Sequence, residues 1–190
     1  VKPNFGDSSF GITQKSVAHT NEELLDALNS IKENIGKGKP ILVEEFLSGK
    51  DLSLGIVGNP MLGSFTAYPI IEEDYSKIPA DLPQICGYEA KWDPSSPYSK
   101  VFSKKAKLDE ETRRSIEEWS LMLFERLDCR DYARFDWRLD SAGIPKLLEV
   151  NPNPGWCWDG HLARMAEHDG YNYTDMLEAI LTSAEQRIEL

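Results

Sequence analysis

Apolar and polar residues alternate most regularly in the stretch 133–151. Two alternating runs flank Asp140-Ser141-Ala142-Gly143, a polar segment that contains a glycine. A period of two is typical of half-buried strands, and a short polar, glycine-containing segment between two such runs predicts a β-hairpin. We therefore predict two antiparallel strands that are joined by a turn at 140–143.

The predicted hairpin gathers polar side chains on one face. Side chains alternate across a strand, so Arg134 shares a face with Asp136, and Glu149 shares a face with Asn151. Folding about the turn brings the two pairs opposite each other. One guanidinium, two carboxylates and an amide oxygen then converge, and oxygen ligands of this kind suit Mg²⁺ that also contacts substrate phosphates. The pattern predicts a site for a metal-bound nucleotide.

Helical spacing of apolar residues marks four other segments. Thr20 and Glu23 have the spacing of a capping box and precede an apolar stripe with a helical period. Asp109 precedes a second stripe of this kind. The chain closes with two further helical patterns, at 161–168 and 174–188. We predict a helix in each of these four places.

We also predict a strand at 11–17 and, from shorter apolar runs, strands at 41–47, 52–57 and 61–70. Short turns separate the last three runs, which implies antiparallel pairing. The stretch 71–107 is less regular and contains Asp93-Pro94-Ser95-Ser96-Pro97, and a long loop of this composition is often functional. The order of strand, helix, several strands, helix, hairpin and helices predicts the α+β class.

Composition narrows the functional classes. With 190 residues, 41% of them hydrophobic, the chain can bury a core as one domain or two small lobes. A net charge of −11 argues against nucleic acid or an anionic membrane as partner, since both require a basic surface. No apolar run has the length of a membrane span, and no signal-peptide pattern opens the chain. Three cysteines without metal-ligand spacing fit a reduced, cytoplasmic setting.

Three polar features near the start of the chain allow two interpretations each. Lys2 is a phosphate contact or a solvated lysine. The loop 4–12, with small residues and two serines, covers a phosphate or is an ordinary turn. Glu44 and Glu45 at the end of a strand bind an adenine or ribose, or form a charged sheet end.

Val1-Lys2-Pro3 looks like the end of a strand without a preceding element, so we expect a piece of a longer protein.

Four motifs carry a resemblance to a known family. Arg134-x-Asp136, followed by Leu148-Glu149-Val150-Asn151 and Pro154-Gly155, resembles the metal-binding signature of the ATP-grasp superfamily. The other three resemble its D-alanine–D-alanine ligase branch: Val1-Lys2-Pro3 with Gly6-Asp7-Ser8-Ser9-Phe10-Gly11, Val43-Glu44-Glu45-Phe46-Leu47 with Asp51, and Tyr88-Glu89-Ala90-Lys91. All four occur in the order of the family and together cover nearly the whole chain.

The resemblance implies an ATP-grasp fold of the α+β class, with antiparallel sheets, flanking helices and a nucleotide held between two subdomains. Residues 1–190 would form the ATP-grasp domain from the phosphate loop to the C-terminus. Its central nucleotide-binding lobe would span about 1–60 and its Mg²⁺-binding lobe about 61–190. An N-terminal substrate domain would lie upstream and would provide the contact of a homodimer.

The resemblance also implies roles for single residues. Lys2 and Lys91 match lysines that contact the ATP phosphates, while Ser8 and Ser9 lie in the mobile loop that closes over them. The catalytic set would be Arg134, Lys2, Ser9 and Lys91. The residues around the adenosine part would be Glu44, Glu45, Leu47, Asp51, Ile85 and Leu148. The ligands of two Mg²⁺ ions, with Mn²⁺ as the alternative metal, would be Asp136, Glu149 and Asn151.

The implied function is ATP-dependent ligation of a small-molecule carboxylate to an amine through an acyl phosphate. Two positions depart from the D-alanine–D-alanine ligase pattern: Trp92 replaces a tyrosine or phenylalanine, and Gly160 stands near the place of a small hydroxyl residue. With Asp159, these are the candidate substrate positions, and they suggest a larger or positively charged acceptor. Alternatively, Trp156 and Trp158 only pack the loop. The chain could also be a silent nucleotide-binding module or another ATP-grasp ligase or carboxylase.

Overall fold

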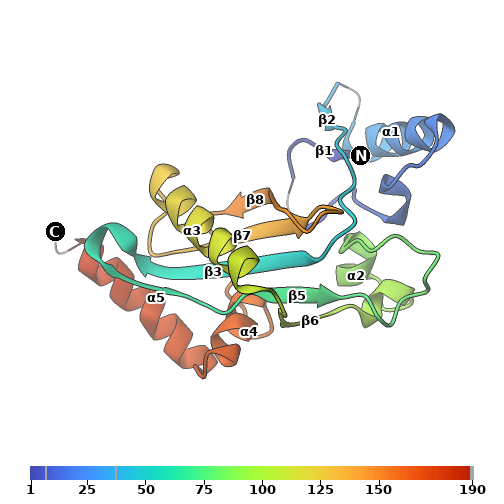
Figure 1. The fold of residues 1–190 in the computed structure, drawn as a ribbon. Coiled ribbons are helices and arrows are strands. Elements are labelled where there is room, and N and C mark those ends of the chain that lie inside the picture. The colour runs from blue at the N-terminus through green and yellow to red at the C-terminus, as the bar shows by residue number, and fades with distance from the viewer. Residues whose placement is uncertain (7, 37, 189–190) are drawn as a thin grey trace. The chain divides into compact units, whose positions relative to one another are not determined.

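The computed structural model describes residues 1–6, 8–36 and 38–188 (Figure 1). Asp7, in the predicted phosphate loop, lies outside the described residues. The chain divides into two compact units, one made of Val1–Phe46 and Asp74–Phe102, the other of Leu47–Glu73 and Ser103–Leu190. The expected lobes, 1–60 and 61–190, differ from these units because the chain passes between the units three times, so that neither unit is a single continuous segment.

The first unit is built around a two-stranded antiparallel sheet and one long helix. Strand β1 (Lys2–Pro3) pairs with β2 (Ile41–Leu42), and α1 (Asn21–Ile35) lies between them in the chain. The other elements of the unit are the short helices η1 (Gln14–Ser16), α2 (Tyr88–Trp92) and η3 (Pro97–Lys100). The capping box of α1 is confirmed, since Glu23 N donates to Thr20 Oγ1 at 3.1 Å and Thr20 N to Glu23 Oε2 at 3.2 Å.

Two predicted strands of this unit are wrong. The stretch 11–17 contains η1, because Thr13 and Ser16 exchange side-chain and backbone hydrogen bonds, and such local bonds replace a strand ladder. The predicted strand 41–47 is reduced to Ile41–Leu42, and 43–46 are exposed and outside any strand. Its partner β1 is only two residues long and ends at Pro3, which has no backbone N–H to extend the pairing.

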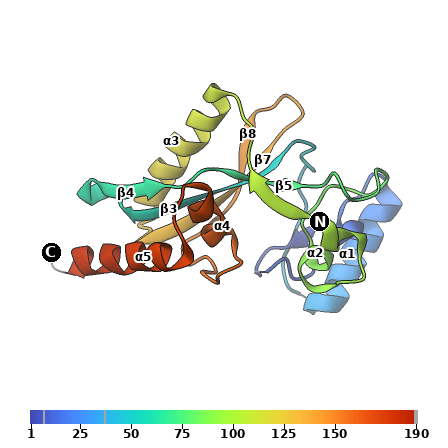
Figure 2. The same cartoon turned by 90° about the horizontal axis from the view of Figure 1, so that it is seen from below.

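The second unit is a sheet covered on both faces (Figures 1 and 2). Strands β6 (Phe102–Lys105), β5 (Ile71–Asp74), β3 (Asp51–Asn59), β7 (Tyr132–Leu139) and β8 (Pro145–Asn151) follow one another, and β4 (Ser64–Ala67) also pairs with β3. Strand β3 is antiparallel to β4, β5 and β7, and β7 is antiparallel to β8. The predicted hairpin is confirmed, and Gly143 N donates to Asp140 O at 3.0 Å in its turn.

The strand predicted at 61–70 is not continuous. The short helix η2 (Pro60–Leu62) follows β3, and Gly63 ends it with a left-handed backbone, φ 70°. A proline at the first helical position and a glycine just after the last one favour a short helix. The remaining residues form β4, and the chain then turns into β5.

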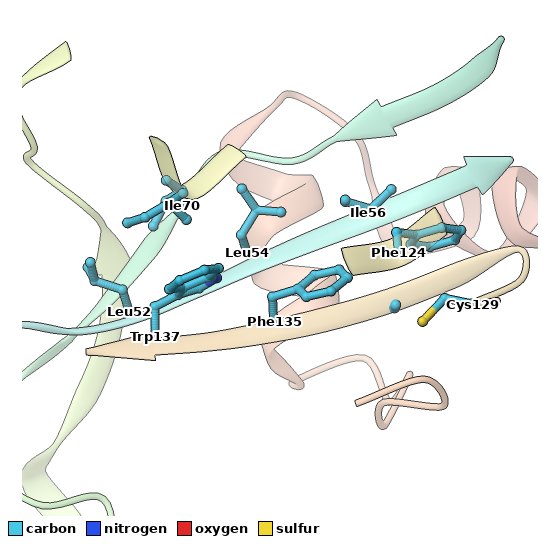
Figure 3. Close-up of a cluster of buried hydrophobic side chains, with 10 residues drawn as sticks. Leu52, Leu54, Ile56, Ile70, Phe124, Cys129, Phe135 and Trp137 are labelled. Atoms are coloured by element: carbon cyan, nitrogen blue, oxygen red, sulfur yellow. The ribbon is translucent and has the colours of Figure 1, made fainter. Parts of the chain in front are cut away.

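Alternate residues of β3 face two different hydrophobic clusters. Leu52, Leu54 and Ile56 belong to a cluster with Ile116 and Phe124 of α3 (Glu110–Arg126). They point to the same side of the sheet as Phe135 and Trp137 of β7, as Figure 3 shows. The opposite face packs against α4 (His161–His168) and α5 (Tyr173–Ile188), in a cluster that contains Val57, Leu162 and Met165. All three helices lie close to the positions predicted from the sequence.

Gly55, on the α4 face of β3, permits close packing. A Cβ atom at this position would lie 2.6 Å from Leu162 Cδ1 and 3.1 Å from Met165 Sδ. Only a residue without a side chain lets α4 approach the strand this closely, so Gly55 helps to determine how tightly α4 packs on β3. The polar residues of the predicted site lie on this same face.

A buried polar cluster attaches the end of α5 to the sheet. Arg187 donates to Asp131 from Nε at 3.0 Å and from Nη2 at 2.8 Å. Asn59 Nδ2 donates to Ser183 O at 2.8 Å, and its Oδ1 accepts from Asp131 N at 3.2 Å. The hydrogen bond and charge of Arg187, aided by Asn59, hold the pKa of Asp131 below its usual range.

Replacement of Asp131 by Asn should therefore lower stability in a pH-dependent way. We expect a loss of about 1–3 kcal/mol of unfolding free energy at pH 7. Because the folded carboxyl has the lower pKa, its contribution is complete above the unfolded pKa of about 3.9 and is lost as the pH falls below that value. Urea denaturation at pH 7, 5, 3.5 and 2.5 should show a constant difference between the two proteins at the first two values and a shrinking difference at the last two.

Asp128→Asn is the matched control. Asp128 and Asp131 both have a positive φ, of 53° and 66°, and Asp128 also pairs with an arginine, Arg130, but the Asp128 side chain is 73% exposed. Exposed pairs contribute little, so this variant should match the parent protein at every pH. A constant difference between Asp131→Asn and the parent across the pH range would contradict the assigned ion pair.

Candidate functional site

The antiparallel register aligns a row of polar side chains across three strands. Ser53 on β3 lies opposite Asp136 on β7, which lies opposite Glu149 on β8. Arg134 on β7 lies opposite Asn151 on β8. Residues opposite each other in an antiparallel pair point to the same face, so the predicted convergence of the hairpin side chains is confirmed.

Strand β8 contains a β-bulge beside this row. Asp136 pairs with Glu149, whereas the next residue, Trp137, pairs with Leu147, so Leu148 is the extra residue. The bulge lets Glu149 face the polar side while Trp137 stays in the core on the other side. Leu148 itself is 37% exposed.

The carboxylate of Asp136 accepts four hydrogen bonds from three side chains. Its Oδ1 accepts from Ser53 Oγ at 2.7 Å and from Arg134 Nε at 2.8 Å. Its Oδ2 accepts from Arg134 Nη2 at 2.8 Å and from Asn151 Nδ2 at 2.9 Å. The Asp136 side chain is only 15% exposed, so this is a buried carboxylate with four hydrogen-bond donors.

Electrostatics keeps both members of the Arg134–Asp136 pair charged. Burial disfavours a charged carboxylate, but the hydrogen bonds and charge of Arg134, with the hydroxyl of Ser53, hold the pKa of Asp136 below its usual range. Burial also opposes the charge of Arg134, yet the Asp136 carboxylate raises the pKa of the guanidinium. The Arg134 guanidinium is therefore positively charged and the Asp136 carboxylate negatively charged.

Two carboxylates converge on the amide of Asn151. Its Nδ2 donates to Asp136 Oδ2 at 2.9 Å and to Glu149 Oε1 at 3.2 Å. An N–H donor thus stands at the point where a cation would meet both carboxylates, and rotation of the amide would bring its oxygen there instead. This oxygen donor set fits Mg²⁺. Within residues 1–6, 8–36 and 38–188 no group of three or more His, Cys, Asp or Glu is placed to hold a metal ion, so the candidate set is two carboxylates and one amide.

The structure adds residues that the sequence interpretation missed. Glu73 on β5 is a buried carboxylate whose Oε1 accepts from Ser103 Oγ at 2.9 Å and lies 3.1 Å from His161 Nε2. Burial alone would raise the pKa of Glu73, but the hydrogen bond and charge of His161 lower it instead. The acids Glu72 and Glu73 directly after two isoleucines were the available signal, because charged residues inside an apolar strand usually have buried partners.

In the first unit, the loop that contains Ser8 and Ser9, which we call the serine loop, contacts α2 and the residues just before it. Lys91 Nζ donates to Ser9 Oγ at 2.8 Å, and Ser9 Oγ donates to Cys86 O at 3.1 Å. Tyr88 N donates to Ile12 O at 2.7 Å. Ser9 and the neighbouring Ser8 both have left-handed backbones, with φ of 59° and 53°, a conformation that is rare for residues other than glycine.

The remaining predicted residues are described within their own units. Lys2 Nζ lies 2.5 Å from Glu44 Oε1, an ion pair of the first unit. Asp51 accepts from Arg138 Nη1 at 3.3 Å in the second unit. Of the other adenosine candidates, Glu45 is exposed, whereas Leu47 and Ile85 are half-buried.

The substrate candidates are close to solvent. Trp92, the last residue of α2, is 59% exposed. Asp159 is exposed and its carbonyl accepts from Arg164 Nε at 3.1 Å, while Gly160 is the N-cap of α4. Trp156 and Trp158 are 52% and 71% exposed, which argues against the alternative that they only pack the loop.

The chain as a whole is similar to known proteins. The model of the family described as "D-ala D-ala ligase C-terminus" matches residues 1–182. The chain belongs to this family. The ATP-grasp fold of the α+β class, expected from the sequence, is confirmed by the solved structures to which the chain is similar.

Two curated relatives show the extent of the match. One is the uncharacterized protein y4sG of Sinorhizobium fredii, 30% identical over 192 residues, covering 98% of this chain and 52% of the relative. Another is a D-alanine–D-alanine ligase of Desulfotalea psychrophila, 29% identical over 181 residues, covering 95% and 52%. The chain thus spans about half the length of the curated relatives it matches.

Two solved structures show the same fold. The VanG D-Ala:D-Ser ligase of Enterococcus faecalis has a TM-score of 0.69 at 23% identity, covering 95% of this chain and 48% of that protein. The D-alanine–D-alanine ligase of Bacillus anthracis, solved with ATP, has a TM-score of 0.65 at 22% identity, covering 89% and 49%. In the described part of this chain, no helix is long and apolar enough to cross a membrane.

Gly87, directly before α2, offers a test of how the serine loop is attached. A Cβ atom at Gly87 would lie 2.8 Å from the backbone oxygen of Ile12, which cannot move without shifting the loop. We expect Gly87→Ala to cost about 1–3 kcal/mol. The thermal unfolding midpoint should fall by roughly 2–4 °C for each kcal/mol.

Gly155→Ala is the control, because nothing lies within 4 Å of a Cβ at Gly155. Its unfolding midpoint should stay within about 1 °C of the parent, as for substitutions away from packed features. Equal midpoints for Gly87→Ala and Gly155→Ala would show that the loop and α2 are not in tight contact.

Proposed function

We propose that the chain is the C-terminal catalytic part of an ATP-dependent ligase that joins a carboxylate to an amine through an acyl phosphate. The observation that carries the proposal is the convergence of Arg134, Asp136, Glu149 and Asn151 on one sheet face. Support comes from the family match over residues 1–182, since several relatives bear the name D-alanine–D-alanine ligase.

In the proposed reaction a carboxylate oxygen attacks the γ-phosphorus of ATP, and the bond from that phosphorus to the β–γ bridging oxygen breaks to release ADP. An amine nitrogen then attacks the acyl carbon, phosphate leaves, and the amine loses a proton. The first step brings two anions together, so positive charge must be concentrated where they meet. In a chain with a net charge of −11, only local cations provide it.

The residues of the second unit would supply that charge and hold the metal. Asp136, Glu149 and Asn151 would bind Mg²⁺, which when bound supplies Lewis-acid polarisation of phosphate oxygens. Arg134, a permanent cation with a planar set of donors, would neutralise charge on the transferred phosphoryl group.

The residues of the first unit would orient the phosphates. Lys91 and Ser9 already share a hydrogen bond, so the lysine and the hydroxyl are held as one donor group. Lys2 is held by Glu44. A loop that covers the phosphates would exclude water, which otherwise hydrolyses ATP or the acyl phosphate.

The acceptor substrate differs, in our proposal, from D-alanine. Trp92, Trp156 and Trp158 present large aromatic surfaces to solvent, and Asp159 adds a carboxylate beside the last two. Aromatic faces and a carboxylate favour an acceptor that is larger or positively charged. We place this reaction in the cytoplasm, with small molecules as substrates.

Loss of the two carboxylates should abolish Mg²⁺-dependent ATP binding. For Asp136→Asn with Glu149→Gln we expect no detectable heat in calorimetry under conditions where the parent saturates. The reason is that both charged ligands are gone. Circular dichroism should confirm the fold. Glu149→Gln alone, at an exposed position, should weaken binding at least about tenfold, or 1.4 kcal/mol.

The control is Asp128→Asn with Glu185→Gln, which makes the same change of net charge at two exposed positions. It should bind Mg²⁺ and ATP as the parent does. Unchanged ATP affinity in the site variants would disprove the metal-ligand assignment.

A substrate screen tests the reaction class. The full-length protein should release ADP and phosphate only when a carboxylate and an amine are both present, because the acyl phosphate forms and is consumed in sequence. D-Alanine alone should give no turnover. Turnover with D-alanine alone would show that Trp92 and Gly160 do not change the substrate, and ATP binding without turnover on any pair would favour a nucleotide-binding module.

A further inference from the structure

The carboxylate of Asp136 has no free acceptor position. An ionised carboxylate offers about four lone-pair sites. Each Asp136 oxygen accepts two hydrogen bonds, from Ser53 and Arg134 on Oδ1 and from Arg134 and Asn151 on Oδ2. A divalent cation that approaches Asp136 therefore has to displace at least one donor.

The three donating side chains differ in what they can do when a cation arrives. The hydroxyl of Ser53 can rotate, because it both donates and accepts. The amide of Asn151 can turn its oxygen toward a cation. Arg134 has no acceptor atom and keeps its positive charge, so it can only repel a metal ion or leave.

Arg134 is also the strongest of the three partners. It holds both oxygens of Asp136 through two parallel hydrogen bonds at 2.8 Å, the bidentate geometry that suits guanidinium and carboxylate. The pair is mostly buried, with side-chain exposures of 19% and 15%, so water screens it little. Arg134 thus supplies the positive charge beside Asp136 that a bound metal ion would otherwise supply.

We propose that Arg134 blocks the cation position of Asp136 in the nucleotide-free protein and leaves it only when another anion accepts the guanidinium. The inference rests on the proposed function, in which a nucleotide phosphate is that anion. Arg134 then makes cation binding and nucleotide binding cooperative, since each ligand removes an obstacle to the other. The free protein accordingly binds a divalent cation poorly, and ATP strengthens that binding.

The test measures binding of Mn²⁺ alone to the full-length protein, by electron paramagnetic resonance of the free ion. Arg134→Gln should bind Mn²⁺ at least tenfold more tightly than the parent, because the competing cation is gone. Arg134→Lys should fall between the two, since an ammonium keeps the charge but cannot hold both oxygens. The Lys variant also keeps the test valid if Arg134→Gln is too unstable to fold.

Arg164→Gln controls for the loss of a positive charge. Arg164 lies on α4 and donates to Asp159 O, with no bond to Asp136. It should leave Mn²⁺ affinity within about threefold of the parent. Ser53→Ala removes one donor but leaves the charge of Arg134 in place, so any gain should stay well below that of Arg134→Gln. An increase in Arg164→Gln or Ser53→Ala equal to that in Arg134→Gln would overturn the proposal.

Measurements of Mn²⁺ binding with and without ATP distinguish a failure of this inference from a failure of the proposed function. ATP should raise the Mn²⁺ affinity of the parent at least tenfold and that of Arg134→Gln by a smaller factor. If the parent binds Mn²⁺ with ATP but Arg134→Gln and Arg134→Lys bind Mn²⁺ alone no better than the parent, the block by Arg134 is wrong while the proposed site stands. If the parent shows no Mn²⁺-dependent ATP binding, the proposed function itself fails, and the inference with it.

Discussion

The register between β3, β7 and β8 is the constraint on which the other features of the second unit depend. It places Ser53, Asp136 and Glu149 in one row and sends Leu52, Leu54, Phe135 and Trp137 to the opposite face. Because the side-chain period of a strand is two, a slip by one residue would bury the carboxylates under α3 and expose the aromatic core. The hydrophobic core thus enforces the alignment of the polar row.

The polar row has an energetic cost that the core offsets. Replacing a buried ion pair by apolar residues is often neutral or stabilising, so Arg134 and Asp136 are weak evidence of stabilisation. Removal of either partner alone would leave a buried charge without its counter-ion. Under the proposed function, the pair is a charged group kept ready for a ligand, and Ser53 and Asn151 complete its hydrogen bonding in the free protein.

The sequence predicted those parts of the site that are local in the chain. The hairpin, its shared faces and the long helices follow from periodicity, capping residues and a turn, all within about twenty residues. Ser53 and Glu73 were not predicted as members, because their partners Asp136 and His161 lie more than 80 residues away. The residues 43–46 were predicted as the end of a strand that begins with the apolar run Ile41-Leu42-Val43, but no partner strand reaches them.

The loop 152–160 is under weaker structural constraints than the polar row of β3, β7 and β8. It lies between β8 and α4, outside both, and most of its side chains are exposed, including Trp156, Cys157 and Trp158. Substitutions at exposed loop positions rarely cost much folding free energy, whereas changes in the polar row alter buried charges. Descendants of such a protein can therefore exchange the residues of this loop, and with them the surface it presents, while the machinery on the strands is inherited unchanged.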